Sequence, residues 1–251
     1  MMLPVSEIFY SLQGEGIHAG RPSIFLRLGG CNLRCPGFGV VKEVDGKRFV
    51  GCDTMQAVYT EPFGKLWQGY ENPLELIQDM EATLPHDKGA DIVLTGGEPT
   101  LYNQDKVLLE VLAYFLQKGR DVTIETNATV SIDFDAFPRY KECIFAMAVK
   151  LSNSGEPESK RINDKAIRRI CTHAKEKFFK LVLDADHLKQ LGNEVHTLAA
   201  NYDAPVYCMP LGHNPATLSQ NDRAVFSFCA AHGYRYSERA HVRVWGDKAK
   251  V

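Results

Sequence analysis

Apolar, β-prone runs alternate with segments of helical periodicity along most of the chain. The apolar runs predict strands at Ser23–Leu28, Ile92–Thr95, Asp121–Thr126, Ile144–Lys150, Phe179–Leu183 and Pro205–Met209. The helical patterns predict helices at Pro73–Leu84, Gln104–Lys118, Asp164–Lys177, His187–Asn201 and Gln220–His232. This alternation is typical of βαβ units, so we expect an α/β fold with a parallel sheet, either open and wound or closed into a full or partial barrel.

Polar segments of unusual composition follow five of the predicted strands. They are the segment that starts at Cys31, Gly96-Gly97-Glu98-Pro99, Glu125-Thr126-Asn127, Lys150-Leu151-Ser152-Asn153-Ser154 and Met209-Pro210-Leu211-Gly212. The carboxyl ends of parallel strands meet at one edge of the sheet, where α/β proteins place their active sites. We therefore expect the five segments to converge on one mouth.

Three cysteines follow the first predicted strand: Cys31, Cys35 and Cys52. Three thiolates are one ligand short of a closed tetrahedral site, so a metal or cluster held by them keeps one position open for a substrate. The long gap before Cys52 contains Asp45-Gly46 between two β-prone arms, which suits a type I′ hairpin turn. In that hairpin Val44 faces Lys47 and Gly39 faces Cys52, and the third cysteine returns toward Cys35.

Two other interpretations of the cysteines stay open at this point. They could be unrelated buried thiols, because free cysteine is often buried. They could also form a structural zinc site, although no fourth Cys or His lies nearby and the spacing of His18 is poor. The remaining cysteines, at positions 143, 171, 208 and 229, fall within predicted strands or helices, and we assign them to the core.

Composition narrows the class of protein. The chain has 251 residues, 45% hydrophobic content and a net charge of −2, which fit a globular protein with a substantial core and disfavour a general nucleic-acid binder. The sequence contains neither a stretch of the ~18 apolar residues of a membrane span nor a secretory signal. We expect a cytoplasmic protein, where seven cysteines serve as ligands, reactive thiols and core residues rather than as disulfides.

These motifs together carry a resemblance. The chain resembles radical S-adenosylmethionine (SAM) enzymes and, within them, the 7-carboxy-7-deazaguanine synthase family. The similar segments are Ser-Leu-Gln-Gly-Glu-Gly at 11–16, Arg27, the cysteines with Cys-Asp-Thr at 52–54, Thr-Gly-Gly-Glu-Pro at 95–99, Glu-Thr-Asn at 125–127, Lys-Leu-Ser-Asn-Ser-Gly at 150–155 and His-Val-Arg-Val-Trp-Gly at 241–246. The resemblance implies one radical SAM domain over residues 1–251. It would be a partial (β/α) barrel of about six parallel strands, with a β-hairpin inserted at about 36–51.

The resemblance also implies a chemistry. The three cysteines would bind three irons of a [4Fe–4S] cluster, and SAM would chelate the fourth iron. Reductive cleavage of SAM would give a 5′-deoxyadenosyl radical that abstracts hydrogen from 6-carboxy-5,6,7,8-tetrahydropterin. Ring contraction with loss of ammonia would yield 7-carboxy-7-deazaguanine. Mg²⁺, a homodimer and a flavodoxin-like electron donor are the usual family arrangement.

Site residues follow from the resemblance position by position. The pterin would contact Leu12, Gln13, Gly14, Glu15, Arg27 and Thr95, with the Arg27 guanidinium on its carboxylate. SAM would contact Gly51, Asp53, Gly97, Glu98, Glu125, Asn127, Ala148, Val149, Lys150, Met209 and Pro210, with Glu98 accepting from its ammonium group. Thr54 would be the Mg²⁺ ligand.

Two departures separate this chain from the family pattern. The usual spacing is Cys-x3-Cys-x2-Cys, whereas the inserted hairpin displaces Cys52, and Met209 stands where the family often has Gln. Two rival functions also remain. A glycyl-radical-enzyme activase shares the cysteines and the Gly-Gly-Glu turn but usually opens with Asp-Gly-Pro-Gly. An iron–sulfur electron carrier or a zinc-stabilised binding module would normally have four ligands.

Overall fold

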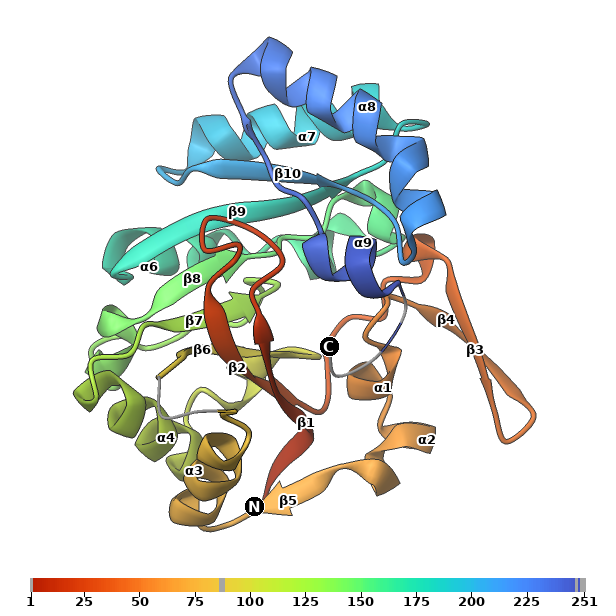
Figure 1. The fold of residues 1–251 in the computed structure, drawn as a ribbon. Coiled ribbons are helices and arrows are strands. Elements are labelled where there is room, and N and C mark those ends of the chain that lie inside the picture. The colour runs from red at the N-terminus through yellow and green to blue at the C-terminus, as the bar shows by residue number, and fades with distance from the viewer. Residues whose placement is uncertain (1, 86–88, 247, 249–251) are drawn as a thin grey trace.

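The computed structural model describes residues 2–85, 89–246 and 248, so the extreme ends of the predicted domain lie outside the described residues. A sheet with strand order β11-β10-β9-β8-β7-β6-β2-β1-β5 forms its centre (Figure 1). Its parallel strands are β2 (Pro22–Leu28), β6 (Asp91–Gly96), β7 (Val122–Thr126), β8 (Ile144–Met147), β9 (Glu176–Leu183), β10 (Val206–Pro210) and the short β11 (Arg235–Tyr236). The first six are the predicted strands in chain order, and the expected partial (β/α) barrel is confirmed.

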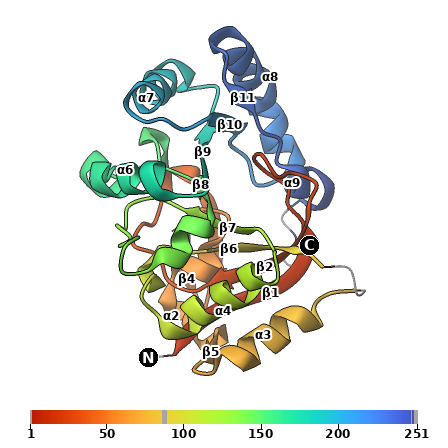
Figure 2. The same cartoon turned by 90° about the vertical axis from the view of Figure 1, so that its left-hand side faces the viewer.

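The long helices cover the outer face of this sheet (Figures 1 and 2). They are α3 (Pro73–Ala82), α4 (Lys106–Gln117), α6 (Asp164–His173), α7 (Leu188–Asn201) and α8 (Pro215–His232). The prediction of helix to Lys177 was wrong, because Glu176 already begins β9. Helix α8 begins five residues earlier than predicted, because Asn214 forms a capping box with Thr217 and Pro215 takes the first helical position.

One continuous hydrophobic core lies between the sheet and these helices. Leu26, Ile124 and Leu181 from the strands pack there with Leu112 of α4 and Val195 of α7, and each is at most 2% exposed. Full burial of one such side chain contributes about 1.5–3 kcal/mol.

Short helices α1 (Met55–Val58), α2 (Thr60–Phe63), α5 (Glu158–Arg161) and α9 (Ala240–Trp245) lie in the connections, as do the 3₁₀ turns η1 (Pro36–Phe38), η2 (Gly64–Leu66), η3 (Pro99–Tyr102), η4 (Pro138–Glu142) and η5 (Ser152–Ser154).

Two antiparallel strands that the pattern did not predict extend the sheet beyond β2. Strand β1 (Leu3–Leu12) pairs with β2, and β5 (Gln68–Tyr70) pairs with β1. Leu3 and Val5 of β1 enter the main core, whereas Glu7 and Phe9 line the cavity described below. A strand with polar residues on a buried face does not show the simple alternation that predicts strands.

Residues 13–21, which connect β1 to β2, reach across to the far side of the barrel. The Gly16 amide donates to Ser237 Oγ over 2.8 Å, and the Ala240 amide donates to the Gly14 carbonyl over 3.0 Å. Gly16 has φ of +74° and packs against the ring of Phe178 on β9, where a Cβ atom would lie 2.8 Å from the ring. This connection therefore links the two sides of the open barrel.

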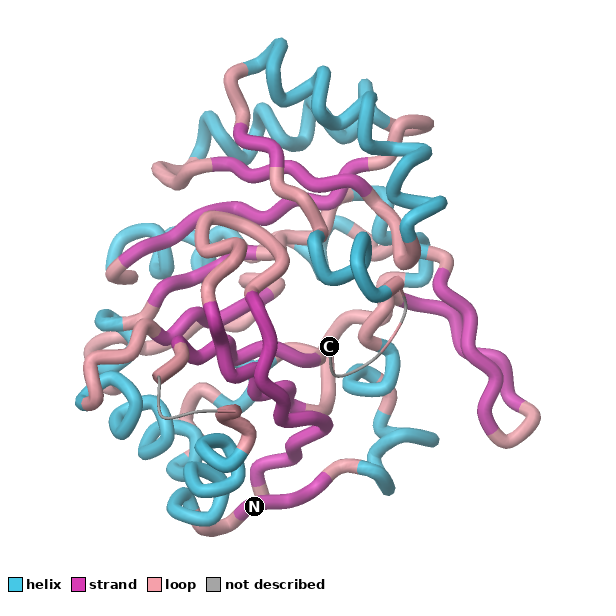
Figure 3. The backbone as a smooth tube through the Cα atoms, viewed as in Figure 1, coloured by secondary structure: helices cyan, strands magenta, loops and turns pink. Residues whose placement is uncertain are grey.

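The predicted hairpin is present as β3 (Val40–Val44) and β4 (Lys47–Gly51), and it projects from the body of the molecule (Figure 3). Val44 pairs with Lys47, as predicted, and Val40 pairs with Gly51. Asp45 and Gly46 both have positive φ, as a type I′ turn requires. The ladder brings the chain back to its starting point immediately before Cys52.

Candidate functional site

A cavity of about 1440 Å³ lies at the carboxyl ends of the parallel strands and extends into the barrel. Most predicted site residues line it, from every predicted segment: Leu12, Gln13, Gly14, Glu15, Arg27, Cys31, Cys35, Cys52, Asp53, Thr54, Thr95, Gly97, Glu125, Asn127, Ala148, Lys150 and Met209. The expected convergence on one mouth is thus present in the structure.

Four predicted SAM contacts do not line this cavity. Val149 is 2% exposed and packs in the main core, and Pro210 is buried at the end of β10. Gly51 lies at the base of the hairpin, where an added Cβ would approach the Arg34 carbonyl to 2.8 Å. Glu98 is fully buried. The predicted SAM contacts at these four positions stay predictions, and at Gly51 and Val149 they could be made only through the backbone.

The three cysteines line the same cavity. Burial raises the pKa of Cys31 and of Cys35 to about 12, and it raises the pKa of Cys52 as well. The charges of Cys35 and Cys52 add to the effect on Cys31, so the thiols lie within electrostatic reach of one another. Buried thiols in this state become ligands only where a cation compensates the thiolate charge.

The donor set fits a cluster better than a single ion. Within the described residues, no group of three His, Cys, Asp or Glu side chains is close enough to hold one metal ion. A [4Fe–4S] cluster binds each thiolate through a different iron and so tolerates wider spacing. The Leu33 amide donates to Cys31 Sγ over 3.4 Å, which is the kind of hydrogen bond that tunes cluster sulfurs. A structural zinc site, which normally has four protein ligands, would need one donor more than the three cysteines supply.

The Gly-Gly-Glu turn packs tightly against the segment that leads to the cysteines. A Cβ at Gly96, which has φ of +129°, would lie 2.2 Å from the Leu28 carbonyl, and one at Gly97 would lie 2.0 Å from the Gly30 carbonyl. The amides of Gly97 and Glu98 donate to these same two carbonyls over 3.0 and 2.8 Å. The glycines are thus required for contact between backbones, a reason that sequence alone did not supply.

Glu98 organises the neighbouring strand ends. Its carboxylate accepts from the hydroxyls of Thr100 and Thr126 and from the amides of Thr100 and Asn127. Burial raises the pKa of Glu98, and these hydrogen bonds partly offset that rise. Both oxygens of Glu98 are thus engaged within the protein, and one of them holds the Asn127 amide at the cavity wall.

The β1 and β2 strands supply an aromatic and charged wall inside the barrel. The rings of Phe9 and Phe25 stack at 4.9 Å, and the guanidinium of Arg27 lies 5.8 Å from the Phe9 ring. Arg27 Nε donates to Glu7 over 2.8 Å, and of its nitrogens Nε alone bonds to another described residue. The prediction missed Glu7 and Phe9, because β1 itself was not predicted, and it missed Phe25 although its strand β2 was predicted.

A buried lysine stands at the centre of the cavity wall. Lys180 of β9 bonds Glu15 over 2.9 Å and Glu125 over 2.7 Å. Glu125 also accepts from Thr95 over 2.9 Å and from Gln13 over 3.3 Å. Sequence reasoning missed this lysine, although a lysine inside the apolar run Phe178–Leu183 was a usable signal, since a buried charge requires partners.

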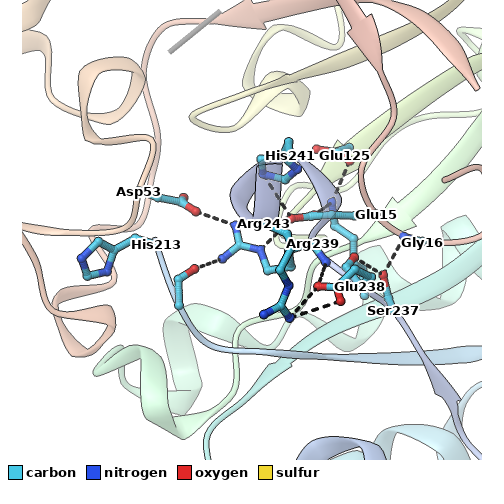
Figure 4. Close-up of polar contacts among 12 residues, drawn as sticks. Glu15, Gly16, Asp53, Glu125, His213, Ser237, Glu238, Arg239, His241 and Arg243 are labelled. Carbon is cyan, nitrogen blue, oxygen red and sulfur yellow. Dashed lines mark hydrogen bonds and ion pairs between the residues drawn. The ribbon is translucent and has the colours of Figure 1, made fainter. Parts of the chain in front are cut away.

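Arg239 continues this series of ion pairs from Glu15 to Asp53, the residue after Cys52 (Figure 4). Its Nε donates to Glu15 over 2.8 Å, one terminal nitrogen donates to Asp53 over 2.6 Å, and the other donates to the Gly212 carbonyl. His241 Nε2 lies 3.7 Å from Glu15. Arg239 was also missed, because the resemblance in that region began at His241.

A site of this composition, with three thiols and a charged barrel interior at the mouth of a partial (β/α) barrel, defines an iron–sulfur protein of the barrel class. The chain belongs to the 4Fe-4S single cluster domain family, which matches residues 12–171.

Similar proteins are known along nearly the whole chain. The 7-carboxy-7-deazaguanine synthase of Halobacterium salinarum is 29% identical over 98% of this chain and 91% of its own length. That of Pyrobaculum aerophilum is also 29% identical, over 97% and 95%. The crystal structure of QueE from Escherichia coli superposes with a TM-score of 0.66 at 21% identity, covering 96% of this chain and 95% of that one, and supports the fold.

Proposed function

We propose that this protein is a 7-carboxy-7-deazaguanine synthase, a radical SAM lyase that converts 6-carboxy-5,6,7,8-tetrahydropterin to 7-carboxy-7-deazaguanine with loss of ammonia. The observation that carries the proposal is one continuous cavity, which joins three thiols at its mouth to a charged and aromatic barrel interior. The full-length similarity to curated synthases supports it.

Cys31, Cys35 and Cys52 would hold the [4Fe–4S] cluster, and three thiolates would leave one position of the cluster open for SAM. When bound, the cluster and SAM supply the electron and the radical that start the reaction. The protein's part is to orient the substrate and exclude water, and the location of the barrel interior behind the thiols suits both tasks.

SAM would be held at the strand ends next to the cysteines. The backbone of Gly97 and the side chains of Asn127 and Lys150 line that part of the cavity, together with Ala148 and Met209. Asn127 is preorganised, since its amide is held by Glu98 and its side chain bonds Asn32 over 2.9 Å. Met209 cannot donate a hydrogen bond, so this position contributes only an apolar contact.

The pterin occupies the barrel interior. Arg27 retains nitrogens for the pterin carboxylate, and Phe9 offers an aromatic surface beside it. Gln13 of the β1–β2 connection, Thr95 of β6 and Glu125 of β7 supply a polar edge, already aligned because Gln13 and Thr95 both donate to Glu125. Leu12, Gly14 and Glu15 complete the wall from the β1–β2 connection.

Thr54 is the proposed Mg²⁺ ligand. It occupies the N-cap of α1, yet its hydroxyl makes no capping hydrogen bond to the described chain and lies 3.3 Å from Cys52 Sγ. A hydroxyl that faces the cavity beside the cysteines is available for a cation that also binds substrate oxygens.

The remaining proposals concern partners and location. We infer a cytoplasmic homodimer that receives electrons from a flavodoxin-like protein, and we do not assign it a nucleic-acid or membrane partner. Among the described helices, none is both long and apolar enough to cross a bilayer.

An anaerobic turnover assay tests the function. The reconstituted protein is mixed with SAM, Mg²⁺, a reductant and the tetrahydropterin, and the products are identified by mass spectrometry. Formation of 7-carboxy-7-deazaguanine, lost when SAM is omitted, is expected. Cleavage of SAM without that product would overturn the substrate assignment. Iron without SAM cleavage would favour an electron carrier instead.

A further inference from the structure

The chain itself does not fix the position of the third cysteine. Residues 36–51 separate Cys35 from Cys52, and a loop of that length leaves its ends free until other contacts hold them. The hairpin ladder ends at the Val40–Gly51 pair, one residue before Cys52. Contacts beyond the hairpin must therefore orient Cys52 and the two residues after it.

Arg239 makes such a contact, directly after Cys52. It donates to Asp53 over 2.6 Å, to Glu15 over 2.8 Å and to the Gly212 carbonyl. Arg239 is 8% exposed, and its three acceptors come from the cluster segment, the β1–β2 connection and the segment after β10. Figure 4 shows the guanidinium between Asp53 and Glu15.

We propose that Arg239 is a positioning residue that fixes the Cys52–Thr54 segment relative to the barrel interior. A guanidinium suits this role because its donors point in fixed directions within one plane. The network of ion pairs extends beyond Arg239, since Glu15 also pairs with Lys180, and Lys180 pairs with Glu125 on β7. The expected effect on turnover rests on the proposed function, whereas the effect on the cluster does not.

Substitution by lysine tests the direction of these donors rather than the charge. Arg239→Lys keeps a cation beside Glu15, so the protein is expected to fold, but an ammonium cannot reach all three acceptors in the same geometry. Arg239→Ala removes both the directed donors and the positive charge. Arg243→Lys is the matched control: Arg243 lies on α9, which begins directly after Arg239, pairs with Asp222 and Glu238, and is not among the residues that line the cavity.

Three quantities are measured for each variant: iron per chain, the electron paramagnetic resonance spectrum of the reduced cluster before and after addition of SAM, and kcat and KM for the pterin. We expect Arg239→Lys to bind iron but to give a broadened, heterogeneous spectrum with SAM. We expect its kcat to fall by about 100-fold with a smaller change in KM, as for a misplaced reacting group. Arg239→Ala shows the same spectral change, and Arg243→Lys matches the unsubstituted protein in all three.

An unchanged SAM-dependent spectrum and kcat in Arg239→Lys would overturn the proposal, because the charge alone would then suffice. If the protein cleaves SAM but forms no deazaguanine, the proposed function fails separately. The spectra with and without SAM still decide whether Arg239 positions the cluster segment.

Discussion

At the scale of single residues, the site depends on charges that are buried together. Lys180 is 5% exposed and lies between the carboxylates of Glu15 and Glu125. Arg239 pairs with the other carboxylate oxygen of Glu15. A charge is costly to bury alone, so each charge in this series of ion pairs depends on its neighbours. Most substitutions here would therefore affect stability and binding together.

Lys180→Met should destabilise the protein by about 3 kcal/mol, because it leaves Glu15 and Glu125 buried without their shared cation. Lys175→Met is the control: Lys175 pairs with Asp121 at the surface, where loss of the pair costs below about 1 kcal/mol. Anaerobic urea unfolding measures both. Equal losses for the two variants would contradict the assigned role of Lys180.

The same series of ion pairs predicts that the stability of the protein depends on pH. Burial tends to raise the pKa of Glu15, but the charges of Lys180, Arg239 and His241 outweigh it and hold the pKa well below its ordinary 4.5. The unfolded chain therefore takes up a proton first as the pH falls, and stability should decrease below about pH 4.5. Glu98, whose pKa burial raises, acts in the opposite direction above that pH.

Urea unfolding at a series of pH values below 4.5 checks this prediction. Lys180→Met should show a weaker loss of stability with acid than the unsubstituted protein, because part of the lowering of the Glu15 pKa comes from Lys180. A steeper loss in the variant would contradict the assignment.

At the scale of elements, the hairpin connects the fold to the cysteines. Phe49 of β4 packs on Tyr59 at 5.2 Å and on Phe63 at 6.1 Å, and the Tyr59 hydroxyl donates to the Val50 carbonyl over 2.9 Å. These contacts hold the returning arm against the body of the protein just before Cys52. The tip of the hairpin, in contrast, is exposed.

Phe49→Ala should reduce stability by about 1–2 kcal/mol, less than a fully buried phenylalanine, since the ring is half-buried. It should also lower the iron retained per chain after gel filtration, because Cys52 follows the loosened strand. Arg48→Ala, on the exposed side of the same strand, should leave iron content unchanged. A matching iron loss in both variants would argue that the hairpin does not support the site.

Sequence predicted the parallel strands and the hairpin well, because each has a local signal: an apolar run, or Asp-Gly between β-prone arms. It failed for β1, whose Glu7 and Phe9 face a polar cavity. It also could not show that Gly96 and Gly97 pack against the backbone before the cysteines or that Glu98 bonds the neighbouring strand end, because these contacts are long-range. Lys180 and Arg239 were missed for a related reason, since their partners lie far away in the chain.

At the scale of the whole molecule, the barrel is closed by the connection between β1 and β2. This segment carries Gln13 and Glu15 into the cavity and rests on β9 and on the segment before α9 through Gly16. The position of the pterin wall therefore depends on contacts between parts of the chain more than 150 residues apart.

Gly16→Ala should destabilise the protein by about 1–3 kcal/mol and raise KM for the pterin, because the new methyl group would meet the Phe178 ring at 2.8 Å. Gly20→Ala is a close control, since its φ of +90° also disfavours alanine but no atom lies within 4 Å of the added Cβ. Urea unfolding and steady-state kinetics should separate the two. Identical behaviour would assign the effect to backbone strain rather than to closure of the barrel.

The most direct test of the account compares two cysteine substitutions in the same turnover assay. Cys52 lines the cavity, whereas Cys171 lies half-buried on α6 and outside it. After anaerobic reconstitution, Cys171→Ala should bind a full cluster and form 7-carboxy-7-deazaguanine at the unsubstituted rate, and Cys52→Ala should form none and lose its cluster. Deazaguanine formation by Cys52→Ala would contradict the central claim that the displaced cysteine completes a working cluster site.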